Sequence, residues 1–204
     1  GEGGLNKFFV GAGFKIYKGL SAGLNLSYLF GTIQNINSLE FPYGTNYYNS
    51  KYITSRTASG VNFNLGLLYE KSFGEERKLT AGFTFSPNTP INGLKNQSYY
   101  NYTLSVYGNE IQKDSVYSEK EQDGTIRMPS YWRTGITYGV TDNWMAGVDF
   151  SYHNWENYES FGVQDSLQNS YSIQVGGLKS TSKFVYRLGA RYSKTYLELR
   201  QTRL

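Results

Sequence analysis

The chain has 204 residues, of which 39% are hydrophobic and 17% aromatic, and its formal net charge is +4. It has no run of about 18 apolar residues for a membrane-spanning helix, no cysteine for a disulfide or thiolate metal site, and no basic cluster interleaved with aromatic residues. These features exclude a helical membrane protein and a nucleic-acid-binding module. They do not exclude a β-barrel, whose apolar residues are spread in alternation.

Bulky apolar residues alternate with small or polar ones along much of the chain, which predicts β-strands because successive side chains point to opposite faces. In residues 20–31, for example, Leu24 and Leu26 alternate with Gly23 and Asn25. Seven further segments repeat the pattern. We therefore expect about eight strands, which in chain order cover residues 6–16, 20–31, 60–71, 78–86, 131–140, 144–155, 169–177 and 183–193.

The connections between these segments alternate in length. Short connections are expected at 17–19, 74–77, 141–143 and 179–182, and long ones at 34–59, 88–123 and 156–169. Short turns at one end and long loops at the other are typical of an antiparallel up-and-down transmembrane β-barrel in a bacterial outer membrane. The alternative is a soluble β-sandwich or lipocalin-like barrel with the apolar face turned inward.

The two predicted faces of the strands differ in a way that favours the membrane barrel. Glycine, serine, asparagine and threonine dominate one face, as suits a crowded barrel interior. The apolar face has aliphatic residues in the middle of each strand and aromatic residues near both ends, like the two aromatic girdles of a lipid-facing band. The aromatic residues in question are Phe14, Tyr69, Tyr138, Trp144 and Phe184 near the short turns, and Tyr28, Phe30, Tyr152 and Tyr192 near the long loops.

The order of the turns also bears on domain organisation. If the short turns are periplasmic, the first strand begins and the last strand finishes on the outer side, whereas complete single-chain barrels normally have both termini in the periplasm. We therefore expect residues 1–204 to form a single barrel domain that lacks at least one strand at each end.

Three stretches resemble Bacteroidetes outer-membrane proteins of the FadL-like group, which includes long-chain fatty acid transporters and the PorV-related proteins of secretion machines. They are "GEGGLNKFFVGAGFKIYKGLSAGLNLSYLFGTI", "GTIRMPSYWRTGITYGVTDNWMAGVDFSYHNWENYESFG" and "YRLGARYSKTYLELR". The resemblance implies a barrel of about fourteen strands, of which this chain is an internal segment. The group's N-terminal hatch, with its Asn-Pro-Ala turn, has no counterpart in this sequence.

The resemblance implies two functions of different classes. The first is passive transport of long-chain fatty acids or other hydrophobic compounds across the outer membrane. The second is an accessory or scaffold subunit of a secretion or assembly machine, as for PorV. The expected partners are therefore outer-membrane lipid, a fatty acid or hydrophobic small molecule, and other outer-membrane or secretion-complex proteins bound through the long loops.

Charged residues on the predicted inner face are the candidate ligand-binding residues. An arginine side chain there can pair with a carboxylate headgroup in bidentate fashion, for which Arg187 and Arg191 are the best candidates. The alternative is that the charges pair with one another inside the barrel. The inward set is Glu70, Arg133, Asp149, Arg187 and Arg191.

His153, the only histidine, shares the inner face with Asp149 and Ser151. These are the residue types of a hydrolase triad, but residues two apart on one strand stand roughly 7 Å from each other, too far for the contacts that a triad needs. We therefore expect a hydrogen-bonded network in the lumen and no enzyme. No metal-ligand spacing, phosphate loop or cofactor fingerprint is present, so no cofactor is expected.

Two further features lie near the longest predicted loop. Pro129 interrupts a strand, because proline cannot donate to the ladder, and in FadL-like barrels a strand kink opens a lateral gate; the alternative is a simple strand entry. The loop 96–124 is rich in tyrosine and then in charge. It can dock a partner or capture a ligand, or it can be a solvated loop with its own hairpin.

Overall fold

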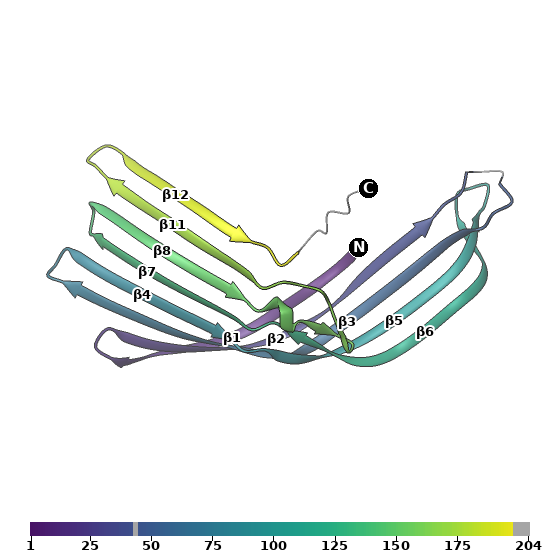
Figure 1. Cartoon of the computed structure of the whole chain (residues 1–204), viewed down its shortest axis with the longest axis horizontal. Helices are drawn as coiled ribbons and strands as arrows, with labels where there is room; N and C mark the ends of the chain where they lie inside the picture. The colour runs from purple at the N-terminus through teal and green to yellow at the C-terminus, as the bar shows by residue number, and fades with distance from the viewer. Residues whose placement is uncertain (43–44, 198–204) are drawn as a thin grey trace. The chain divides into compact units, whose positions relative to one another are not determined.

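The computed structural model describes residues 1–42 and 45–197. Twelve strands belong to one sheet, and each pair of strands whose register is described runs antiparallel (Figure 1). A single 3-10 turn, η1 (Trp155–Asn157), interrupts the strands. Within the described ranges, no helix is long and apolar enough to cross a bilayer. The strands are β1 (Glu2–Tyr17), β2 (Leu20–Leu39), β3 (Asn49–Phe73), β4 (Arg77–Ser86), β5 (Thr89–Leu104), β6 (Glu110–Met128), β7 (Tyr131–Val140), β8 (Trp144–His153), β9 (Glu159–Ser160), β10 (Val163–Gln164), β11 (Ser170–Ser180) and β12 (Val185–Lys194).

All eight predicted strands are present, as β1, β2, β3, β4, β7, β8, β11 and β12. The predicted short connections are also confirmed as tight turns. At the β1–β2 turn the backbone of Gly19 has φ +78°, and the carbonyl oxygen of Glu70 occupies the space that a β-carbon would need. Glycine is therefore the residue that fits this turn, where Glu70 N–H donates to the Gly19 carbonyl over 2.7 Å.

The prediction of long loops at 34–59 and 88–123 is wrong, because most of these residues form strands. β2 continues to Leu39, β3 begins at Asn49, and β5 and β6 form a hairpin. Residues 43–44 lie outside the described part. Residues 49–59 of β3 pair with residues 92–102 of β5, and these stretches are rich in serine, threonine, asparagine and tyrosine on both faces. A strand that is polar on both sides has no apolar alternation, so the period-two signal is missing.

Two prolines separate consecutive strands. Pro87 lies between β4 and β5, which both pair with β3, and Pro129 lies between β6 and β7. Pro129 thus lies at a break between two strands, and Pro87 lies at a second one. At the Pro129 break, the carbonyl of Ser130 accepts a hydrogen bond from Asn154 N–H over 2.9 Å.

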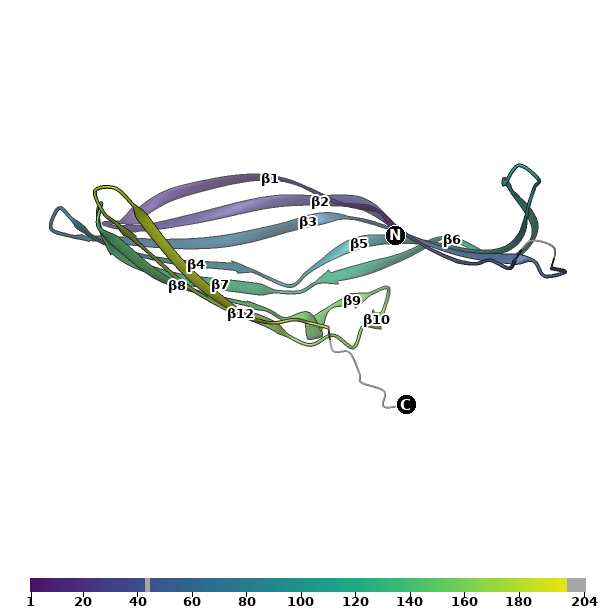
Figure 2. The same cartoon turned by 90° about the horizontal axis from the view of Figure 1, so that it is seen from above.

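The chain divides into two compact units that share the long strands β1, β2 and β3. The first unit comprises residues 1–8, 28–60 and 90–126, and the second comprises 9–27, 61–89 and 127–204. In the first unit, β3, β5 and β6 run together (Figure 2). In the second, β4, β7, β8, β11 and β12 lie side by side with short turns at one end (Figure 1).

Buried hydrophobic side chains are few, and those of the described residues all lie in the first unit: Ala58, Ile91, Tyr102 and Ile126. Many large apolar residues of the second unit are exposed instead. Val148 is 39% exposed and Leu188 is 85% exposed. A water-soluble core built from these strands would bury such residues, so this arrangement contradicts the soluble sandwich alternative.

Candidate functional site

The strand register of the second unit separates its side chains onto two faces, because residues paired across strands point the same way. Residues of one face, which we call the apolar face, are aliphatic or aromatic for the most part, and many of the large ones are exposed. Examples from five neighbouring strands are Ala81, Ile136, Val148, Val175 and Ala190, which are aligned by the register. The register places the aromatic residues Tyr69, Tyr138, Trp144, Tyr152 and Tyr192, assigned from the sequence, on this same face.

Residues of the opposite face, which we call the polar face, are small, hydroxylated or charged. Two aligned rows cross the five strands β4, β7, β8, β11 and β12 and place polar groups from distant parts of the sequence side by side. One row is Thr84, Arg133, Ser151, Ser172 and Ser193, and the next is Gly82, Gly135, Asp149, Gln174 and Arg191.

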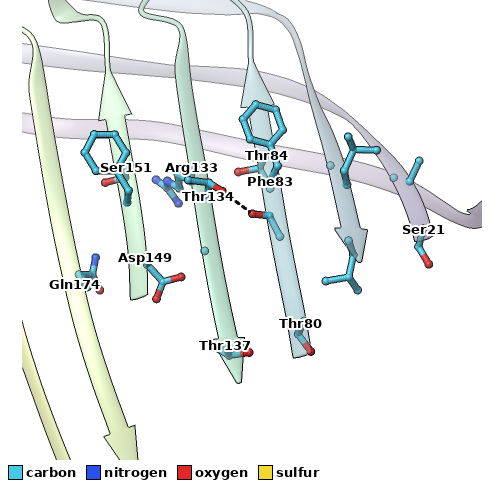
Figure 3. Close-up of a pocket in the computed structure, with 18 of the residues that line it drawn as sticks. Ser21, Thr80, Phe83, Thr84, Arg133, Thr134, Thr137, Asp149, Ser151 and Gln174 are labelled. Carbon is cyan, nitrogen blue, oxygen red and sulfur yellow. Dashed lines mark hydrogen bonds between the residues drawn. The ribbon is translucent and has the colours of Figure 1, made fainter. Parts of the chain in front are cut away.

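A hollow of about 890 Å³ lies on the polar face within the second unit (Figure 3). It has the size of a pocket for a small ligand. Threonines line one side of it, and arginine, aspartate and glutamine side chains line the other. The residues that carry its polar groups are Ser21, Thr80, Thr84, Arg133, Thr137, Asp149, Ser151, His153, Gln174 and Arg191.

Glycines on the polar face make room for the charged side chains of the hollow. Asp149 is paired with Gly135, and its Oδ1 fills the space where a β-carbon of residue 135 would lie. Gly147 lies similarly close to its register partner Thr137, because a β-carbon at residue 147 would lie 2.6 Å from Thr137 Cγ2. Because these contacts are with neighbouring side chains, any larger residue at 135 or 147 would displace them.

Hydrogen bonds and ring contacts fix the polar groups near the Pro129 break. The hydroxyls of Ser151 and Ser172 are joined by a hydrogen bond of 2.7 Å. His153 stacks on Tyr131 with ring centroids 5.2 Å apart, and the Arg133 guanidinium lies 5.1 Å from the centroid of the same tyrosine ring. Ser151 is thus bonded to a serine and His153 is held by a ring, an arrangement unlike a hydrolase triad.

The structure brings together four of the six sequence-predicted lumen residues: Arg133, Asp149, His153 and Arg191 line the hollow. Glu70 does not line it, because its Oε1 lies 2.5 Å from Lys78 Nζ near the β3–β4 turn. Arg187 lines an adjoining hollow of about 430 Å³, which shares Thr137 and Asp149 with the first one.

The predicted mutual pairing of inward charges holds for none of these arginines in the described part of the chain. Its ion pairs join Lys51 to Glu110, Lys78 to Glu70 and Arg127 to Glu159. The guanidinium groups of Arg133 and Arg191 and the carboxylate of Asp149 therefore stand unpaired around the hollow, where the two cationic groups outnumber the one anionic group. Such a site favours a ligand with an anionic group.

Sequence reasoning missed the contribution of β11. Ser172 and Gln174 were placed in a predicted strand but not among the site residues, although the alternation around Ile173 puts both on the polar face. A register for β8 and β11, obtained by aligning Gly147 with Gly176, would have found them.

A second polar cluster, also missed, lies in the first unit. The hydroxyl of buried Tyr102 donates to Glu40 Oε1 over 3.0 Å, Lys51 Nζ lies 5.1 Å from the tyrosine ring centroid, and the same ammonium pairs with Glu110. Burial, with the adjacent Glu40 carboxylate, raises the pKa of Tyr102 to about 12. The hydrogen bond to Glu110 raises the pKa of Lys51. The cluster joins residues of β3, β5 and β6 with Glu40, which directly follows β2.

The profile of the BamG family matches residues 1–204. The chain belongs to the BamG family. No curated protein sequence matches this BamG-family chain significantly. Two solved structures resemble it in fold, one described as the CymD monoaromatic hydrocarbon channel and the other as a Pseudomonas aeruginosa FadL homologue.

The two structures superpose on most of this chain, although few of the aligned residues are identical. The CymD match has 11% identity and a TM-score of 0.57 and covers 94% of this chain and 59% of CymD. The FadL homologue match has 13% identity and a TM-score of 0.61 and covers 96% of this chain and 51% of the homologue. The BamG-family chain thus spans between half and three fifths of each structure. It shares the all-β, antiparallel FadL-type fold, and these neighbours are described as a channel and a FadL homologue rather than as enzymes.

Proposed function

We propose that this chain is part of an outer-membrane β-barrel of FadL type that serves as an accessory or scaffold subunit of an outer-membrane assembly or secretion machine. The observation that carries the proposal is the length of the strands in the first unit. A barrel strand needs about 9–11 residues to cross a membrane, and β4, β7, β8 and β12 have 10 residues each. β3 has 25 residues, so more than half of it exceeds what the crossing requires.

The apolar face of the second unit supports the membrane placement. Its side chains are exposed across neighbouring strands, for example Ile136 at 45% and Val175 at 49%. A contiguous apolar surface of this kind is costly in water and is the property of a lipid-facing band. We take the strands of the second unit as the spanning segments and the first unit as the part outside the bilayer.

The first unit has the chemistry of a protein-binding surface. It exposes aromatic and aliphatic side chains near its turns, such as Tyr47, Val106 and Tyr107, among polar residues. Aromatic residues are enriched where proteins bind each other.

The polar face also favours a scaffold over a conduit for apolar compounds. An apolar solute that enters the hollow would remove the charged groups of Arg133, Asp149 and Arg191 from water without providing an opposite charge. This desolvation would cost several kcal/mol. A continuous apolar path through the barrel, which a conduit for hydrophobic compounds needs, is thus poorly matched by these residues.

The second candidate is passive transport of long-chain fatty acids or related amphiphiles, for which the unpaired arginines provide a specific observation. An amphiphile with a carboxylate could place its headgroup on Arg133 or Arg191, and the strand break at Pro129 could serve as a lateral gate. CymD is described as a hydrocarbon channel and shares the fold. Transport requires the amphiphile to pass the hollow.

Purification of the full-length protein from native outer membranes in mild detergent tests the two candidates. We expect a stoichiometric protein partner that is identified by mass spectrometry. A variant in which residues 93–121 are replaced by a short Asn-Gly turn should lose this partner and yet keep its heat-modifiable mobility in gels. A tightly held fatty acid, with no partner in either sample, would support transport and contradict the scaffold role.

A further inference from the structure

The apolar face of the second unit has a groove near the short turns. The groove has a volume of about 700 Å³ and crosses β8, β11 and β12. Its bulky walls are Trp144 and Tyr186 at the end nearest the turns, and Val175 and Leu188 farther along the strands. β11 forms the middle of the groove and is paired on both sides, so both strands that border the floor are in place.

Small residues form the floor of the groove. Gly177 is paired with Ala146 on one side and with Leu188 on the other. Gly176 and Gly177 are consecutive, so β11 has no side chain on either face at this level. The register therefore leaves a depression in the apolar face, directly beside the row that contains the two aromatic walls.

Neighbouring rings hold the aromatic walls in position. Tyr138 meets Trp144 edge-on with ring centroids 5.7 Å apart, and the ring centroid of Phe184 lies 6.3 Å from that of Tyr186. Tryptophan and tyrosine side chains prefer the boundary between hydrocarbon and lipid headgroups. These rings therefore mark the level of the headgroups, and the groove extends from that level along the strands toward the membrane interior.

A lysine lies at this boundary. Lys179 is paired with both Trp144 and Tyr186, so its side chain leaves the apolar face between the two rings. It is exposed and forms no ion pair with any described residue. A lysine in this place packs its stem on apolar surface and extends its ammonium to the interface. The distance along β11 from Lys179 to Val175 is roughly 13 Å at about 3.3 Å per residue, which provides room for the upper part of an acyl chain.

The charge of the adjoining turn favours an anionic headgroup. Residues 179–187 include Lys179, Lys183 and Arg187 and no acidic residue. Arg187 lies on the polar face, so the two lysines remain on the side of the lipid. Asp142, in the neighbouring turn, pairs with neither lysine in the described part of the chain. Lysines beside a spanning segment attract anionic lipids, and an ammonium binds phosphate through charge-assisted hydrogen bonds.

We propose that this groove binds one molecule of an anionic phospholipid, with the phosphate on Lys179 and one acyl chain over Ala146 and Gly177. The site lies on the opposite face of the sheet from the hollow that Arg133 and Asp149 line, so it is distinct from the polar-face site. The inference rests on the membrane placement in the proposed function and is independent of the scaffold role.

Tryptophan fluorescence tests the site, because Trp144 forms one of its walls. The full-length protein is placed in phosphatidylcholine vesicles that contain a minor fraction of either brominated phosphatidylglycerol or brominated phosphatidylcholine. The difference in quenching between the protein and its Trp144→Phe variant gives the contribution of Trp144. We expect the relative association constant at Trp144 to be at least about threefold higher for phosphatidylglycerol than for phosphatidylcholine.

Two variants with matched controls separate the charge from the groove. Lys179→Gln should abolish the preference for phosphatidylglycerol, whereas Lys71→Gln, which removes a lysine from the same face near the β3–β4 turn, should keep it. Ala146→Leu fills the exposed floor without a change of charge and should also abolish the preference. Ala81→Leu makes the same change on the apolar face outside the groove and should keep the preference.

The outcomes distinguish this inference from the membrane placement. Equal quenching by the two lipids, a preference that survives Lys179→Gln or Ala146→Leu, or an equal loss in Lys71→Gln would overturn the lipid site and leave the membrane placement standing. Absence of quenching by either lipid would contradict both. Co-purification of a protein partner tests the scaffold role separately, and Lys179→Gln should leave it unaffected.

Discussion

Asp149 lies across Gly135, its register partner on β7, so closely that Oδ1 occupies the position of a missing β-carbon. The carboxylate is thereby placed at the floor of the hollow, one row from Arg133. A charged group can occupy this position because residue 135 has no side chain. Gly135 thus provides the space on the polar face that the Asp149 carboxylate fills.

Replacement of Gly135 by alanine should therefore destabilise the second unit. We expect a small loss, below about 1 kcal/mol, because the atom in the way is the end of the exposed Asp149 side chain, which can rotate aside. Gly82 is the matched control, because it is the cross-strand partner of Gly135 on β4 and a β-carbon there would meet nothing within 4 Å. Thermal unfolding in detergent, followed by gel mobility, should show a lower midpoint for Gly135→Ala than for Gly82→Ala.

The double variant Gly135→Ala with Asp149→Ala checks the cause. Removal of the carboxylate should recover most of the lost stability, since the clash is with that side chain. Equal midpoints for the two alanine variants would contradict the packing argument.

A charge on the apolar face should cost far more than the same charge on the polar face. Val175 and Gln174 are adjacent on β11 and point to opposite faces. We expect Val175→Arg to lower the free energy of unfolding by about 2–4 kcal/mol in a bilayer, because arginine at mid-membrane is unfavourable, and Gln174→Arg to change it by less than about 1 kcal/mol. Folding into vesicles under a urea titration measures both. Similar losses for the two variants would contradict the assignment of faces.

The cluster around Tyr102 should make the first unit sensitive to high pH. Its pKa of about 12 lies above the ordinary value of 10.0, so folding favours the neutral phenol. This stabilisation is complete below pH 10 and is lost as the pH rises from 10 towards 12. Absorbance at about 295 nm should show that the late-ionising tyrosines lose one member in Tyr102→Phe; Tyr117, whose pKa is also raised by its hydrogen bond to Glu119, should remain among them.

The same substitution should cost about 1 kcal/mol at neutral pH, because it removes the hydrogen bond to Glu40. Limited proteolysis of residues 88–126 reports this loss. Tyr107→Phe, at an exposed tyrosine, serves as the control. An unchanged number of late-ionising tyrosines in Tyr102→Phe would refute this assignment.

The arginines of the hollow make a prediction for the second candidate function. If an anionic amphiphile binds there, Arg133→Gln with Arg191→Gln should weaken laurate binding at least tenfold, because charge-assisted hydrogen bonds contribute about 1.5–3 kcal/mol each. Isothermal titration with the full-length protein measures this. Unchanged laurate affinity would remove the hollow as its site, whereas co-purification of a protein partner should be unaffected.

Sequence alternation was sufficient to predict the strands of the second unit because one face there is apolar and the other polar. Val148 and Asp149 illustrate this: neighbours in sequence, they were assigned to opposite faces, and the register confirms it. The short turns followed from the same pattern. The inward direction of Arg133 and Arg191 was likewise predictable, since side-chain direction in a strand depends only on parity.

The remaining features depend on contacts between distant residues. The extension of β3 back to Asn49 was not predictable, because its residues are polar on both faces and are ordered by pairing with β5. The pairing of Lys51 with Glu110, and of Glu70 with Lys78, depends on register that one sequence does not reveal. The break at Pro87 could have been predicted by the reasoning applied to Pro129.

The claim on which this account depends is that the apolar face contacts lipid and the polar face does not. Because the chain has no cysteine, single cysteines can be placed in turn at positions 148, 149, 150 and 151 of the full-length protein and labelled with a fluorophore in vesicles. Brominated lipid should quench the labels at 148 and 150 strongly, and aqueous iodide should quench those at 149 and 151. Equal quenching at all four positions, or lipid quenching at 149 and 151, would contradict the account.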